Sequence, residues 1–212
     1  MPELKIPAAG RPREQPAGTL RAPLFTTLAA CLRGERRSVI LDLGAPRAGT
    51  IAFCSRFRCR LDIADLAPDI DALNAEQDKA ELARMAEALL PERSDEPADI
   101  VLCWDLLNYL QRPALTALMD RVARRARAGT LVHLLIVYSK NRMPARPGAY
   151  YPVFSPDSDS DEDLRLVNVP ATAEECAAPG YTPETLGRCL SGYHLERGML
   201  LSNGMQEFLY RL

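Results

Sequence analysis

Histidine is scarce in this chain and cysteine is scattered, which leaves little material for a metal site. The 212 residues include two histidines and six cysteines, and no two cysteines form a CxxC pair. Structural zinc sites usually need four such ligands at short spacings. We therefore expect reduced, mostly buried thiols and no bound metal.

The sequence also lacks a long apolar run. The longest, LVHLLIVY over residues 131–138, is interrupted by His133, whereas a membrane-spanning helix needs about 20 apolar residues. The opening MPELKIPAAG has no apolar core of the kind that a secretory signal requires. These features predict a cytoplasmic protein without membrane contact.

The absence of a strong net charge and of two known motifs argues against several classes of function. The formal net charge is −2, which gives no electrostatic reason to expect a nucleic-acid partner. No GxSxG occurs, and we interpret His133 as a core histidine and His194 as exposed, so hydrolysis is disfavoured. The absence of GxGxxG likewise argues against a nicotinamide dehydrogenase.

What is present is the composition of an ordinary globular domain, with 47% hydrophobic and 25% charged residues. The length suits a single core. Residues 1–22 are rich in proline, glycine and arginine and predict a loose N-terminal arm, whereas residues 23–212 predict one domain. Periodicity fades over residues 139–180, which we interpret as a long loop, and its acidic run at 157–163 as solvated.

Apolar runs and amphipathic stretches alternate along the domain. The expected helices cover residues 23–33, 50–57, 74–90, 113–127 and 183–190, and the expected strands cover 38–43, 60–65, 99–104, 130–138, 194–201 and 206–211. Asn203-Gly204 is a strong hairpin signal, so the last two strands should be antiparallel. The order predicts an α/β fold, with a doubly wound, mostly parallel sheet, helices on both faces and a C-terminal antiparallel hairpin.

Three segments carry a resemblance to a known family. They are VILDLGAPRAG at 39–49, RLDIADL at 60–66 and ADIVLCWDLLNYL at 98–110. In these motifs, and in the order of elements over residues 24–212, the chain resembles the class I methyltransferases that use S-adenosylmethionine. The resemblance implies that cofactor and a small-molecule acceptor, with the methyl group transferred by in-line displacement.

The resemblance also implies which residues would hold the cofactor. Asp42 would orient the methionine amine, and the backbone at Gly44 and Ala45 would approach the methionine end closely. Asp65 would accept hydrogen bonds from the ribose hydroxyls, as acids do in related folds. Asp105 would lie at the carboxyl edge of the sheet, next to the same crevice. No residue stands out as a general base, so the catalytic residues stay unassigned.

Two departures from the family pattern open an alternative. Pro46 and Ala48 stand where the family repeats glycine, and no third apolar strand is visible between Leu66 and Asp99. The turn at Gly44 could serve folding alone, and Asp65 could cap a helix, with Asp62 a competitor if the strand ends earlier. The alternative is a degenerate methyltransferase-fold protein that acts as a non-catalytic binding or interaction module.

Overall fold

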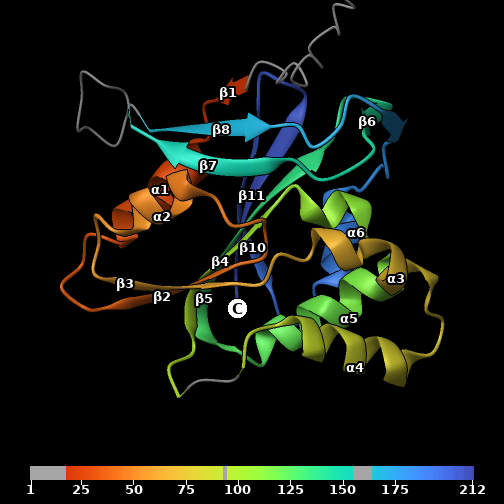
Figure 1. The fold of residues 1–212 in the computed structure, drawn as a ribbon, viewed down its shortest axis with the longest axis horizontal. Coiled ribbons are helices and arrows are strands. Elements are labelled where there is room, and N and C mark those ends of the chain that lie inside the picture. Colours follow the sequence, from red (N-terminus) through yellow and green to blue (C-terminus); the bar gives the residue numbers. More distant parts are fainter. Residues whose placement is uncertain (1–17, 93–94, 155–163) are drawn as a thin grey trace, which may run out of the picture.

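A six-stranded sheet forms the centre of the molecule, in the order β10-β11-β5-β4-β2-β3 (Figure 1). The computed structural model describes residues 18–92, 95–154 and 164–212. The strands are β2 (Ser38–Asp42), β3 (Cys59–Ile63), β4 (Ala98–Trp104), β5 (Ala126–Val137), β10 (His194–Leu200) and β11 (Met205–Arg211). β3, β2, β4 and β5 run parallel, whereas β11 runs antiparallel to both β5 and β10. The expected parallel sheet with its closing hairpin is confirmed.

Helices cover both faces of this sheet (Figure 1). They are α1 (Pro23–Cys31), α2 (Ala48–Cys54), α3 (Ile70–Ala75), α4 (Lys79–Leu89), α5 (Arg112–Ala123) and α6 (Pro183–Cys189), with short 3-10 turns η1 (Ala67–Asp69) and η2 (Leu106–Tyr109). One core joins Leu82 of α4 and Leu115 of α5 to Val101 of β4. The other joins Phe25 of α1 and Phe53 of α2 to the sheet. The sheet is therefore doubly wound, as expected.

The third strand is absent from the described part of the chain between β3 and β4, which holds only η1, α3 and α4. β3 therefore ends the sheet. The helix expected over residues 74–90 begins later, at Lys79 of α4, because Asp78 caps it by accepting a hydrogen bond from Glu81 N at 2.8 Å, and α3 precedes it as a separate helix. Aspartate favours this position because its side chain satisfies a free amide of the first turn.

Short strands appear where the sequence predicted an arm and a loop. β1 (Gly18–Leu20), β8 (Arg165–Val169) and β7 (Ala149–Val153) form a second sheet, and β6 (Arg142–Pro144) pairs with β9 (Glu175–Ala177). β7 packs against α2 beside the main sheet (Figure 1). Strands this short show too little alternation of apolar and polar residues to be predicted from the sequence. Residues 1–17 and the acidic run at 157–163 lie outside the described residues.

A buried polar pair fastens α1 to the sheet. Glu207 of β11 accepts hydrogen bonds from Leu24 N at 3.0 Å and Phe25 N at 2.7 Å, at the start of α1. His133 of β5 places its Nε2 2.8 Å from the same carboxylate, and both side chains are fully buried. His133 is thus a core histidine, as expected, and His194 is exposed. None of the helices in the described residues is both long and apolar enough to cross a membrane.

Candidate functional site

The carboxyl ends of the parallel strands bring the predicted site residues to one edge of the sheet. β2 ends at Asp42 and leads into Gly44, β3 leads to Asp65, and β4 ends at Trp104 just before Asp105. Parallel strands all end on the same side, where open α/β sheets bind ligands. Asp65 lies close enough to Asp42 that its charge helps to raise the pKa of Asp42.

One carboxylate oxygen of Asp42 accepts two hydrogen bonds from donors of its own chain. Its Oδ1 accepts hydrogen bonds from Trp104 Nε1 at 2.6 Å and from Gly44 N at 2.9 Å. The residue is 1% exposed. Burial raises the pKa of Asp42 to about 6, while the hydrogen bonds from Gly44 and Trp104 oppose that rise. An indole N–H therefore already occupies one of the two carboxylate oxygens that the resemblance assigns to the methionine amine.

The same indole lies directly on the glycine turn. A Cβ added to Gly44 would meet Trp104 Cδ1 at 2.6 Å and Nε1 at 2.9 Å. Trp104 has a positive φ of 49°, an unusual backbone conformation for a non-glycine residue. Ala45 is half-buried beside this contact, and Pro46 is exposed. The space beside Gly44, which a ligand could otherwise approach, is thus filled by the Trp104 side chain of β4.

Aromatic rings from two other elements close over the indole. Tyr150 of β7 stacks on Trp104 with ring centroids 5.8 Å apart and planes 7° apart, and Phe25 of α1 packs at 5.6 Å. Trp104 is 2% exposed. The next residue of β7, Tyr151, covers the start of α2, because a Cβ on Gly49 would lie 2.2 Å from its Cδ2. β7 therefore covers the crevice at Trp104 and Gly49, where the sequence predicted only a loop.

Asp105 faces the protein interior. Its Oδ2 accepts hydrogen bonds from Gly148 N at 3.1 Å and from the Tyr150 hydroxyl at 3.4 Å. Its Oδ1 is buried and has no hydrogen-bond partner among the described residues. Burial raises the pKa of Asp105 to about 7. Asp105 thus connects the segment before β7 to the edge of the sheet.

A cavity of about 270 Å³ lies beside this edge, between α3, η2 and the β6–β9 pair. Its lining includes Asn74, Asn108, Tyr109, Met143, Arg146 and Cys176. None of the five residues predicted to hold the cofactor, Asp42, Gly44, Ala45, Asp65 and Asp105, is part of that lining. The five predicted residues lie at the carboxyl edge of the sheet, and this cavity lies next to them.

These residues fit S-adenosylmethionine poorly at the methionine end and better at the ribose. Trp104 fills the contact surface of Gly44 and occupies one carboxylate oxygen of Asp42. Asp65 stays half-buried at the rim, where a carboxylate can accept hydrogen bonds from hydroxyl groups. The sequence predicts that Trp104 neighbours the crevice and that the loop from Lys140 to Phe154, which contains Tyr150, shapes its far side, but it gives no signal for the stacking of the two rings.

Comparison of the sequence with family models and with curated proteins finds no match. Among solved structures, the PH0226 protein from Pyrococcus horikoshii OT3 has a TM-score of 0.51 at 13% identity, covering 89% of this chain and 86% of that one. A candidate methyltransferase from Thermobifida fusca YX has a TM-score of 0.50 at 16% identity, covering 89% and 79%. The 1,6-didemethyltoxoflavin-N1-methyltransferase of Burkholderia thailandensis, with bound S-adenosylhomocysteine, gives 0.47 at 16% identity, covering 87% and 76%. Together with the strand order and the closing hairpin, this similarity shows that the chain has the class I methyltransferase-like fold.

Proposed function

We propose that this protein is a methyltransferase-fold module that binds a partner or ligand without transferring a methyl group. The observation that carries the proposal is the 2.6 Å hydrogen bond from Trp104 Nε1 to Asp42. It supports a crevice whose methionine end is filled by the protein itself. We propose further that residues 23–212 form one domain of a cytoplasmic protein without nucleic-acid or membrane partners, as the sequence predicts.

Opening this crevice would be costly. The indole would have to leave its stacked rings, and burial of a large apolar side chain contributes about 1.5–3 kcal/mol. It would also give up a hydrogen bond to a carboxylate, a type that contributes about 1.5–3 kcal/mol. A cost of roughly 3–6 kcal/mol weakens apparent cofactor affinity by about 10²- to 10⁴-fold.

A second candidate is an S-adenosylmethionine-dependent methyltransferase acting on a small molecule. Its support is that Asp42, Gly44 and Asp65 lie at one sheet edge, next to a cavity of about 270 Å³ that could admit a small acceptor. In that case Asp65 would accept hydrogen bonds from the ribose, and Asp105 would lie near the acceptor. Trp104 would first have to rotate away from Asp42 and from the turn at Gly44 and Ala45.

Isothermal titration with S-adenosylmethionine and S-adenosylhomocysteine separates the two candidates. We expect no saturable heat from the wild type with either compound. Micromolar binding that Asp65→Ala abolishes would contradict the proposal and favour the enzyme. Asp62→Ala is the matched control, because Asp62 lies in β3, which leads to Asp65, but bonds Arg60 at 2.9 Å, away from the crevice.

A further inference from the structure

β3 leaves one edge of the main sheet open. It is the last strand in the order β10-β11-β5-β4-β2-β3, and no strand in the described residues pairs with its outer side. Its pairing with β2 is regular, running from Ser38 opposite Cys59 to Asp42 opposite Ile63. An edge strand of this kind presents unpaired backbone groups that can template the pairing of another chain.

The hydrogen bonds at the two ends of β3 show which backbone groups point outward. Ser38 N donates to Arg58 O at 3.0 Å, and Ala64 N donates to Asp42 O at 2.8 Å. Because direction alternates along a strand, residues 60 and 62 also direct their backbone groups toward β2. Leu61 and Ile63 therefore direct theirs outward, to the open edge.

This edge has only part of the usual protection against pairing. Natural edge strands often carry proline, charged side chains, above all lysine, or a bulge. β3 reads CRLDI, contains neither proline nor lysine, and pairs with β2 without a register shift. Its two charged residues, Arg60 and Asp62, are of opposite sign and flank Leu61.

We propose that β3 pairs antiparallel with β3 of a second copy of this chain, with the twofold axis at Leu61. In this register Arg60 of each copy lies opposite Asp62 of the other. Leu61 directs its backbone outward, so the two Leu61 residues form a hydrogen-bonded pair. The Arg60–Asp62 pairs then fall at non-hydrogen-bonded positions, where facing side chains are closest, with Cα atoms about 4.5 Å apart.

Charge selects this register over its neighbours. A shift of two residues in one direction would place Arg60 opposite Arg60, and a shift in the other direction would place Asp62 opposite Asp62. Like charges directly opposite one another destabilise a strand pair. A shift of one residue would turn the apolar side chains of the added strand to the wrong face. The sequence of β3 is therefore complementary to itself in a single register.

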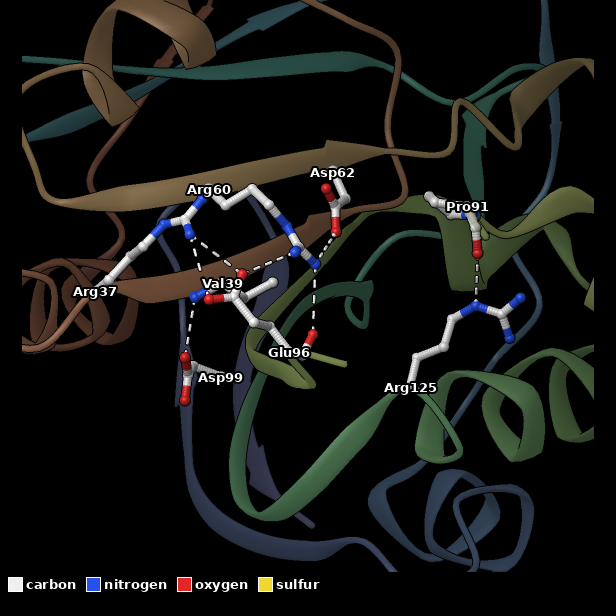
Figure 2. Close-up of polar contacts among 8 residues, drawn as sticks. All are labelled: Arg37, Val39, Arg60, Asp62, Pro91, Glu96, Asp99 and Arg125. Atoms are coloured by element: carbon white, nitrogen blue, oxygen red, sulfur yellow. Dashed lines mark hydrogen bonds and ion pairs between the residues drawn. The ribbon is translucent and has the colours of Figure 1, made fainter. Parts of the chain in front are cut away.

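The side chains that would meet the second copy are already held in place. Arg60 donates to Asp62 Oδ2 and to Glu96 Oε2, each at 2.9 Å, and Arg37 donates to Glu96 at 3.2 Å (Figure 2). The lining of a hollow of about 220 Å³ on this face includes Arg60, Asp62 and Arg125. The ordered network lowers the entropy lost on pairing.

The mass of the protein as a function of concentration tests the pairing. A strand pair of five residues buries little area compared with stable interfaces, so we expect a reversible dimer. Sedimentation equilibrium from about 10 μM to about 1 mM, which spans the dissociation constants of weak complexes, should show the mass rising from 23.4 kDa toward twice that value. A monomer throughout this range would overturn the proposal, whatever the crevice binds.

Charge variants test the register. Arg60→Asp gives the strand two acidic side chains and Asp62→Arg gives it two basic ones, so each variant alone should stay monomeric. An equal mixture of the two should restore the dimer, because opposite charges then face each other. Leu61→Pro, which removes an outward N–H, should also be monomeric, while Arg188→Ala, on α6 and outside this network, should dimerise like the wild type. Circular dichroism checks that each variant folds. Dimers that survive both charge variants would place the interface elsewhere.

Discussion

At the scale of single residues, the end of β4 decides what the crevice can accept. Asp65 and Trp104 both have positive φ values, 48° and 49°. Such a backbone conformation costs of order 1 kcal/mol for a non-glycine residue. At Trp104 the hydrogen bond to Asp42 and the stacking with Tyr150 offset this cost. The protein therefore stabilises an unusual conformation in which its own indole fills the site.

Gly44→Ala tests the contact between the turn and the indole. The new methyl group would lie 2.6 Å from Trp104 Cδ1, so the buried ring must shift. Overpacking of this kind should lower the free energy of unfolding by about 1–3 kcal/mol in urea denaturation. Gly187→Ala in α6 is the control, because nothing lies within 4 Å of its Cβ position, and it should leave stability equal or higher. Equal stability of both variants would contradict the contact.

The buried carboxyl of Asp105 gives a pH dependence of unusual sign. Burial raises its pKa from the ordinary 3.8 to about 7, so the folded chain binds this proton more tightly than the unfolded chain. The stability it contributes is present below pH 3.8 and is lost as the pH rises toward about 7.

Asp105→Asn removes this titration while it keeps the size of the side chain. The variant should be more stable than the wild type at pH 8, by about 1–3 kcal/mol, and less dependent on pH between 4 and 7. Urea denaturation at several pH values measures both effects. Asp71→Asn is the control, since the Asp71 carboxylate is largely exposed and pairs with Arg146 at the surface. A variant that loses stability at pH 8 would contradict the sign.

At the scale of elements, α1 depends on an anchor from the far end of the chain. The helix has no acidic residue in its first turn and no side-chain cap. Glu207 of β11 supplies the missing acceptor, and His133 of β5 bonds the same carboxylate. Because anions are stabilised at helix N-termini, this carboxylate is favoured where it lies.

Glu207→Ala should therefore destabilise the protein strongly. It leaves Leu24 N, Phe25 N and the His133 ring without a partner in the core. We expect a loss of about 3–5 kcal/mol in chemical denaturation. Glu196→Ala removes a partly exposed carboxylate that pairs with Arg211 on the neighbouring strand, and should cost under about 1 kcal/mol. Similar losses for both variants would show that Glu207 is no anchor.

Elements that bury a continuous apolar face could be predicted from the sequence, and others could not. Val39 to Leu41 in β2 and Ile100 to Trp104 in β4 are apolar runs buried on both faces, so pattern alone located them. β1 has three residues and pairs with β8 far along the chain, at Gly18 opposite Asn168. Such a contact is decided by tertiary packing, which local periodicity does not encode.

At the scale of the whole molecule, the same limit applies to the candidate site. The order of elements was enough to place Asp42, Gly44 and Asp65 at one edge of the sheet. The closing of that edge depends on the φ of Trp104 and on Tyr150 from β7, a strand that the sequence did not predict. The methyltransferase-like fold was therefore predictable, whereas the state of its crevice was not.

The most direct measurement uses the fluorescence of Trp104, which is the single tryptophan of the chain. Because the indole is buried and bonded to Asp42, its emission should resist acrylamide quenching, and titration with S-adenosylmethionine to about 1 mM, a weak-binding limit, should leave the spectrum unchanged. A saturable red shift with increased quenching would mean that the cofactor displaces the indole, and would contradict the closed crevice.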